Sequence, residues 1–355
     1  MTTFGDQLFH LGGVPVALNG MGKAMPQKSY FVDGNNGSNG NTGLTPDAAF
    51  LTIQHAIDVV NVAVNTTIDC DILVMGGYYT ETLWFKHTHM GTEELLWVNG
   101  GSNIGLVGKI RMIAVGTAFI EGGTSAVVPT ITIDRPNVEI HDFEMIYMTT
   151  TETITSGNWT LPSGGTVSGY GMPCVYTGDD YNYPEGALVY SAGNTVLINN
   201  CRINGGNKTG GSAFMNHGAK HVYVTNCIIE YGASYGIAMI GSSKGSGAEC
   251  KIAHNVFNQN DTDIYFQAQI TNFIHDCLFM NDGATDHFAG GSGCSYNWID
   301  NCAGLSENLF EAAGSSGIDA TRIYTSTDGG PAGSTNLTTD TWRADLTSTH
   351  GNTSG

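Results

Sequence analysis

A short phrase that recurs five times between residues 187 and 303 limits the fold of this chain more than any other feature. Each copy alternates apolar and polar residues up to a polar pair and a small residue, and then alternates again. The copies occupy residues 194–203, 220–229, 250–257, 269–279 and 295–302. Alternation over so few residues indicates short strands that turn a corner rather than a helix.

Aligned on the small residue that follows Asn or Asp, the copies lie 21 to 29 residues apart. A period of this length indicates a solenoid, whose turns must stack to bury their apolar faces. The Leu-x-x-Leu-x-Leu pattern of leucine-rich repeats is absent. The sequence therefore predicts an all-β fold, a parallel β-helix in which the backbone of each coil pairs with its neighbours about 4.8 Å away.

The repeat alignment predicts two columns of side chains. The small residue should form a buried column, made of Cys201, Cys227, Val256, Cys277 and Cys302. The residue before it should form a ladder at the corner, made of Asn200, Asn226, Asn255, Asp276 and Asn301. Asn tolerates the left-handed conformation of a corner and can bond along a ladder.

The eight cysteines are interpreted as packing residues, because the repeat position that holds four of them also accepts a valine in this alignment. Stacked cysteines close enough to form a disulfide are the alternative. No C-x-x-C pair occurs, so no zinc site is expected.

Composition divides the chain into four regions. Residues 1–28 form an extended attachment arm, whose apolar side chains must lie on the solenoid or on a partner. Residues 29–70 form a cap, residues 71–310 the β-helix with an insertion at 148–186, and residues 311–355 a Gly/Ser/Thr-rich tail. The apolar residues of the arm are Phe4, Leu8, Phe9, Leu11 and Val14.

The cap has the most distinctive sequence. A short strand at 30–33 precedes a Gly/Asn loop at 34–43, and Thr45 and Pro46 then suit the start of a helix. The helix would carry one apolar stripe. Residues 30–58 resemble the opening segment of right-handed parallel β-helix proteins of the pectate-lyase-like superfamily. The resemblance implies a single-stranded β-helix with an N-terminal capping helix, and it implies no particular activity because the fold hosts many.

The charge of the chain bears on its partners. It contains 32 acidic and 13 basic residues, a formal net charge of −19. Counterion release from nucleic acid is therefore not available, and no nucleic acid partner is expected. No apolar run is long enough to span a membrane, and the polar N-terminus does not read as a signal peptide, so we expect synthesis in a host cytoplasm.

The insertion supplies the candidate contact and catalytic residues. Insertions in solenoids map to loops on one face, often the binding face. The contact surface is predicted at Tyr170, Tyr176, Tyr181 and Tyr183, and the alternative catalytic pair is Asp179 and Asp180. The other carboxylates would meet only if the phases of their coils coincide; they are Asp142, Glu144, Glu230, Asp276, Asp282 and Asp300. No basic residue of the repeats, Arg202 included, stands beside a pair of aspartates.

Three histidines, His141, His254 and His275, occupy related places near the corner, where they could bind a metal or simply line a polar face. P-loop, GxSxG and HExxH motifs are absent, so no cofactor is expected.

These features favour a structural virion protein of a tailed bacteriophage, a homotrimer attached by its arm to other capsid or tail proteins. Residues 3–16 and the cap also resemble phage virion proteins. The alternative is a tailspike-type polysaccharide depolymerase or lyase acting on a surface glycan, and a surface adhesin is the second alternative.

Overall fold

The computed structural model describes the parts of the chain that carry the solenoid. The described residues are 9–11, 14–16, 28–64, 68–86, 108–122, 128–135, 137–147, 158–162, 166–168, 172–178, 196–206, 211–217, 219, 221–240, 248–267, 270–280, 286–290, 297–300, 303–304, 323–325 and 330–331. None of the helices in this part of the chain is long and apolar enough to cross a membrane.

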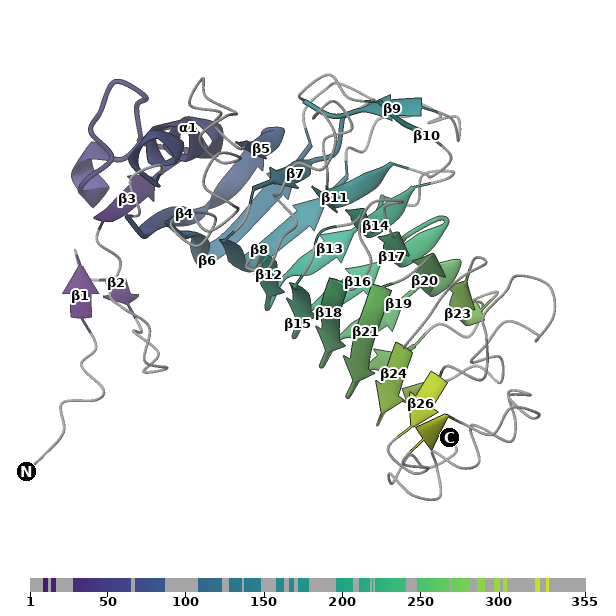
Figure 1. The fold of residues 1–355 in the computed structure, drawn as a ribbon. Helices are drawn as coiled ribbons and strands as arrows, with labels where there is room; N and C mark the ends of the chain where they lie inside the picture. Colours follow the sequence, from purple (N-terminus) through teal and green to yellow (C-terminus); the bar gives the residue numbers. More distant parts are fainter. Residues whose placement is uncertain are drawn as a thin grey trace, which may run out of the picture.

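The strands stack into a solenoid with three faces, which runs from the purple end to the yellow end of the ribbon in Figure 1. The first face contains β3 (Lys28–Val32), β4 (Cys70–Thr80), β6 (Ile110–Glu121), β8 (Val138–Ile146), β12 (Val196–Asn199), β15 (Val222–Thr225), β18 (Ala248–Ala253), β21 (Ile270–His275), β24 (Asn297–Asp300) and β26 (Ile323–Thr325). A short strand, β27 (Gly330–Pro331), pairs antiparallel with β26.

The second face continues around a bend, because β4, β6 and β8 each pair along their C-terminal half with the next coil. It is completed by β13 (Arg202–Asn204), β16 (Ile228–Glu230), β19 (Val256–Asn258), β22 (Leu278–Phe279) and β25 (Ala303–Gly304). The third face contains β5 (Leu83–Lys86), β7 (Ile131–Asp134), β11 (Pro173–Gly178), β14 (Ser212–His217), β17 (Tyr235–Ile240), β20 (Thr262–Gln267) and β23 (Asp286–Gly290). Neighbouring coils pair in parallel on all three faces.

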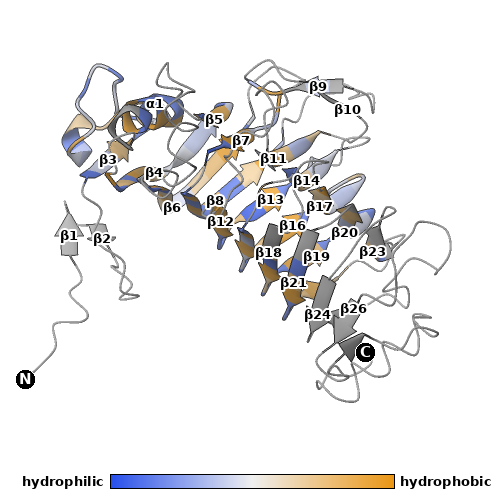
Figure 2. Cartoon of the chain, viewed as in Figure 1, coloured by the Kyte–Doolittle hydropathy of each residue, from blue (hydrophilic) through white to orange (hydrophobic). Residues whose placement is uncertain are grey.

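The core is one continuous column of apolar side chains inside the coils. In β12 and β15 buried and half-buried residues alternate, and Figure 2 shows the matching alternation of apolar and polar residues along the strands. One inward register position of the first face is apolar in seven successive coils: Ile72, Met112, Ile140, Ile198, Val224, Ile252 and Ile274. The prediction of an all-β parallel β-helix with a short helix is confirmed.

In the five successive coils from β8 to β21, the corner between the first and second faces is made by one residue with a positive φ. These residues are Asp142, Asn200, Asn226, His254 and Asp276, with φ between 53° and 68°. The predicted ladder is therefore wrong at Asn255, because His254 holds the corner of that coil. Asn301 lies outside the described residues.

The buried column is shifted by one residue in the same coil. Strand register pairs Val256 with Ile228 and Leu278, both of which are exposed on the outer side. Asn255, 1% exposed, is therefore the residue at the level of Cys227 and Cys277. The placement of Val256 in the buried column is wrong. Successive coils at this position are 28 and 22 residues long, and this change in length shifted the repeat alignment by one residue, from Asn255 to Val256.

The cap covers the first coil, where β3 pairs with β4 and the helix α1 (Ile53–Val64) packs over the end (Figure 1). Pro46 belongs to a separate 3-10 turn, η1 (Pro46–Ala48), so the helix begins later than Thr45 predicted. Its N-terminus is held by Glu81, whose two carboxylate oxygens accept the N–H groups of Ile53 and Gln54, each at 2.9 Å. This satisfies two of the unpaired donors that every helix N-terminus presents.

The arm and the insertion each contain an antiparallel hairpin. In the arm, β1 (Phe9–Leu11) pairs with β2 (Val14–Val16), and Phe4 and Leu8 lie outside the described residues. In the insertion, β9 (Asn158–Thr160) pairs with β10 (Thr166–Ser168). Strand β11, which the sequence assigned to the insertion, is instead a regular member of the third face, between β7 and β14.

Candidate functional site

The second face carries an outward column of side chains that changes character along the solenoid. Successive register positions hold Tyr78, Phe119, Glu144, Arg202, Ile228, Val256 and Leu278. We call this set the mixed column. Its sequence neighbours on the inner side, such as Ile203, Ile229 and Phe257, are fully buried, as the two-residue period of a strand requires.

Arg202 joins two carboxylates at the centre of the mixed column. Its Nε lies 2.7 Å from Glu230 Oε1, and its Nη1 lies 3.7 Å from Glu144 Oε2. Asn204 Nδ2 donates a second hydrogen bond to the same oxygen of Glu230, at 3.1 Å. The hydrogen bond to Glu230 raises the pKa of Arg202, so the guanidinium stays charged.

The two carboxylates differ in their surroundings. The side chain of Glu230 is 4% exposed, whereas that of Glu144 is 37% exposed. Glu230 is therefore fixed by two donors, and Glu144 is open to solvent across the guanidinium from it. Both contact a single guanidinium, so their nearest oxygens are less than about 9 Å apart. This upper limit is compatible with the carboxylate pairs of both retaining glycosidases, at about 5–5.5 Å, and inverting ones, at about 6.5–9.5 Å.

Two aromatic rings lie next to these charges along the mixed column. Tyr78 is 61% exposed, and its ring centroid lies 6.3 Å from that of Phe119. The Tyr78 hydroxyl donates to Glu121, and this hydrogen bond raises the pKa of Tyr78. An exposed ring such as Tyr78, backed by the half-buried Phe119 and lying beside carboxylates and an arginine, can stack on the apolar face of a sugar while the charged groups bind its hydroxyls.

The predicted column of thiols is buried where the structure describes it. Cys201, Cys227 and Cys277 are at most 3% exposed, and all six described cysteines are free. Burial raises the pKa of Cys201 well above its usual value and those of Cys174 and Cys250 to about 12. Such thiols neither ligate metals readily nor react. Cys302 lies outside the described residues.

The candidate contact surface of the insertion is corrected at Tyr176. This residue is fully buried, with Trp159 packed edge-on against it at 5.2 Å and its hydroxyl 3.2 Å from His217 Nδ1. It is buried because β11 is a strand of the third face and β9 packs over it, so Tyr176 is not a contact residue. The remaining predicted residues Tyr170, Tyr181, Tyr183, Asp179 and Asp180 lie outside the described residues.

The sequence indicated Glu144 and Glu230 among the carboxylates that would meet if the phases of their coils coincide, but it did not connect them with Arg202. Glu144 lies 58 residues before Arg202 and Glu230 lies 28 residues after it, so that nothing local marks the set. The repeat alignment held the signal, since Arg202 follows Cys201 directly and Glu230 directly follows the next copy of the phrase.

Comparison with known proteins agrees with this architecture. A family model described as a right-handed β-helix region matches residues 180–326. The chain folds as a right-handed β-helix. The right-handed parallel β-helix that the sequence resemblance implied is thus supported. No curated protein sequence matches the chain significantly.

Several solved structures are similar at low identity. The Escherichia coli protein YbhC aligns with a TM-score of 0.47 and 13% identity, over 81% of this chain and 75% of that one. Pectate lyase Pel9A aligns with a TM-score of 0.42 and 12% identity, over 90% of this chain and 85% of that one. XylC, solved with xylose, aligns with a TM-score of 0.38 and 12% identity, over 78% and 69%. At such identities neither substrates nor catalytic residues transfer to this chain.

Proposed function

We propose that the protein binds a polysaccharide across the mixed column and hydrolyses it with Glu144 and Glu230. The observation that carries the proposal is that Arg202 holds these two carboxylates together on an outer face of a rigid solenoid. Glycoside hydrolysis needs two carboxyl groups at a fixed separation and little other machinery. The sequence-based alternative of a depolymerase is therefore preferred, with its site on the second face rather than at Asp179 and Asp180.

The two carboxylates take different roles in this proposal. Arg202 and Asn204 fix Glu230, so that this residue can hold an attacking water in one orientation. Glu144 is more exposed, and its 3.7 Å contact with Arg202 is the looser of the two. In this proposal it takes up a proton from solvent and delivers it to the oxygen of the leaving sugar as the general acid. Arg202 positions both side chains, and Tyr78 and Phe119 offer a stacking platform for a neighbouring sugar unit.

The negative net charge of the chain favours neutral over anionic polysaccharides as substrates. A formal net charge of −19 repels polyanions such as uronate polymers. Lyase chemistry on a uronate also requires a base next to an acidic sugar, whereas Arg202 is already bonded to Glu230. We therefore propose a neutral glycan as the substrate.

The test is to incubate the purified full chain with neutral and uronic polymers and to measure new reducing ends. We expect cleavage of a neutral polymer and a loss of at least about 100-fold in kcat for Glu144→Gln and Glu230→Gln. Glu139→Gln is the matched control, since Glu139 is 4% exposed and bonded to Lys109 Nζ at 2.6 Å on the first face. Cleavage that survives both variants, or no glycan binding and no cleavage at all, would contradict the proposal.

A structural virion role is the second candidate. The uninterrupted core from Ile72 to Ile274 supports it, since this core gives a rod that needs no ligand to be rigid. The arm with its β1–β2 hairpin would attach the protein to other virion proteins, and the assembly would be a homotrimer. Light scattering on the full chain tests the trimer, and a monodisperse monomer without glycan turnover would exclude both candidates.

A further inference from the structure

We propose that His254, His275 and Asp276 form a binding site for one divalent transition metal ion, of which Zn²⁺ is the best match. His254 and Asp276 are corner residues of two successive coils, and His275 is the last residue of β21. One ligand atom from each lies within 4.8 Å of the other two. The site lies at the corner between the first and second faces. Arg202 belongs to an earlier coil, and the metal site does not depend on the proposed hydrolytic activity.

The geometry of the three side chains converges on one carboxylate oxygen. Asp276 Oδ2 lies 2.7 Å from His275 Nδ1 and 3.7 Å from His254 Nδ1. The two imidazole rings are perpendicular, with centroids 5.3 Å apart. Tetrahedral Zn²⁺ with bonds of about 2.0–2.2 Å places neighbouring ligand atoms roughly 3.3 Å apart, between the two distances found here.

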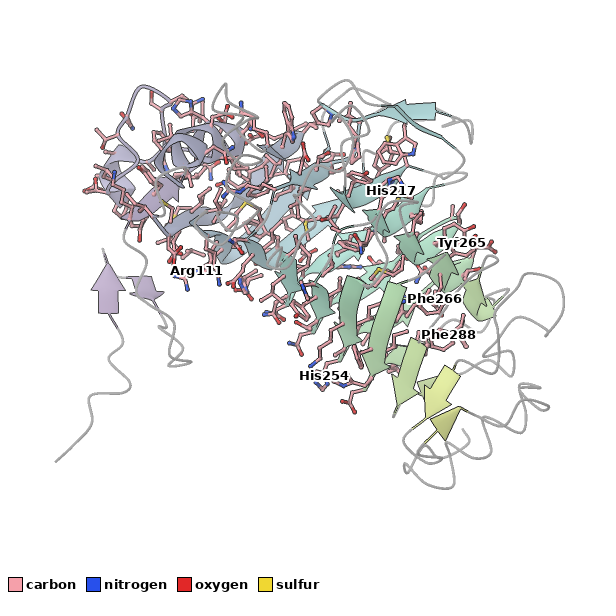
Figure 3. All side chains as sticks on the ribbon, viewed as in Figure 1. Arg111, His217, His254, Tyr265, Phe266 and Phe288 are labelled. Atoms are coloured by element: carbon pink, nitrogen blue, oxygen red, sulfur yellow. The ribbon has the colours of Figure 1, made fainter. Side chains whose placement is uncertain are left out.

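The backbone explains why these side chains meet. His254 and Asp276 have φ of 57° and 54°, so the corner turns both of them to the same side of the solenoid. The coils are tied at this point by a hydrogen bond of 3.1 Å from the N–H of His254 to the carbonyl of His275. The ligands are thus held by paired strands rather than by a loop, and Figure 3 shows His254 at the outer edge of the stacked strands.

The donor set and its exposure indicate the kind of ion. Two imidazoles and one carboxylate suit Zn²⁺ and its neighbours in the first transition row, whereas Ca²⁺ and Mg²⁺ prefer oxygen ligands alone. The side chains of His254, His275 and Asp276 are 52%, 27% and 34% exposed. An ion can therefore enter from solvent and keep a water as its fourth ligand.

The proposed ion would join two successive coils near the C-terminal end of the described solenoid. Binding to the folded chain alone stabilises it by mass action. The ion would then act as a clip between the coil of β18 and β19 and the coil of β21 and β22.

The neighbouring coils suggest variants that keep the fold. Asn already holds the equivalent corner as Asn200 and Asn226, with φ of 53° and 56°, so His254→Asn and Asp276→Asn place the same residue in the same conformation. His275→Asn copies Asn199, which holds the same register position of the first face three coils earlier, in β12. His221→Asn is the control, because His221 also has a positive φ but lies at another corner.

The experiment titrates Zn²⁺ into the metal-free full chain by calorimetry and records the thermal midpoint with and without Zn²⁺. We expect one ion per chain and a raised midpoint for the wild type and for His221→Asn. Each of the three ligand variants should bind at least about tenfold more weakly and lose the rise in midpoint, with an unchanged midpoint in the absence of metal.

Co²⁺ serves as a spectroscopic probe of the same site. We expect its visible bands without the charge-transfer band of a cobalt–thiolate bond, since no cysteine belongs to the site. Absence of stoichiometric Zn²⁺ binding by the wild type, equal binding by the three ligand variants, or a thiolate band would each overturn the proposal.

Discussion

The inner and outer sides of the same strands follow different rules in this protein. On the first face, one inner register position is apolar in seven successive coils, from Ile72 to Ile274. The adjacent outer position holds Asp71, Arg111, Glu139, Leu197, Tyr223, Lys251 and Phe273. The interior specifies the fold and the exterior is free to vary, so any chemistry of the chain has to be sought on its outer faces or corners.

The strongest test of this comparison is truncation of one inner residue. Ile229 is fully buried in β16, and Ile229→Ala should lower the free energy of unfolding by roughly 2–5 kcal/mol through lost burial and a cavity. Ile229→Val, which removes a single methylene, should cost about 0.5–1.5 kcal/mol. Urea unfolding monitored by circular dichroism measures both, and an Ala variant no less stable than the Val variant would show that the interior is not close-packed here.

The next test concerns a polar side chain inside the coil. Asn255 Oδ1 accepts the N–H of Cys227, and its Nδ2 donates to the carbonyl of Val224, both at 2.8 Å. Asn255→Ala leaves two buried backbone groups without these partners and should cost roughly 2–4 kcal/mol. Asn258→Ala, on the outer side of the next strand, should change the stability by less than about 0.5 kcal/mol. Equal effects in urea unfolding would contradict the comparison.

The coils themselves could be predicted from sequence because inner positions repeat. The repeat alignment placed Val256 in the buried column, where the structure has Asn255. The coil length changes at this point, so the alignment was off by one residue. The backbone conformation decides the register, since His254 has φ of 57° there, and sequence alone does not display it. Strand β11 was missed because all its residues are buried, so no alternation marks it.

The residues of the candidate site could not be predicted from the repeat, because they lie on the outer side of the strands. Outer positions do not repeat, so Glu144, Arg202 and Glu230 carry no shared pattern. Their meeting depends on the register of β8, β13 and β16, which sets Glu144 opposite Arg202 and Glu230 beside Asn204. Only a correct alignment of three coils brings these residues together.

A buried histidine on the third face makes stability depend on pH. Burial lowers the pKa of His217 from 6.5 to about 4. Because the folded-state pKa is the lower one, the unfolded chain takes up the proton first, and the stability associated with neutral His217 is lost as the pH falls from 6.5 through 4. The loss from this residue should be about 3 kcal/mol.

His217→Asn is the variant that isolates this effect. Between pH 6.5 and 4, its unfolding free energy should fall less steeply with pH than that of the wild type. The two slopes should differ by at most the amount that corresponds to the uptake of one proton on unfolding. Parallel pH profiles for the two proteins would show that His217 is not kept neutral by burial.

The smallest effect is expected for a residue on the outer side of β16, the strand that contains Ile229. Ile228 is the neighbour of Ile229 in β16 but is 43% exposed. Ile228→Thr keeps a β-branched side chain, so the strand preference is preserved and little buried area is lost. The free energy of unfolding should change by less than about 0.5 kcal/mol, a value that urea unfolding resolves against Ile229→Ala. A loss as large as that of the inner variant would mean that another surface covers Ile228 in solution, and the change should then depend on protein concentration, because association of copies is a mass-action effect.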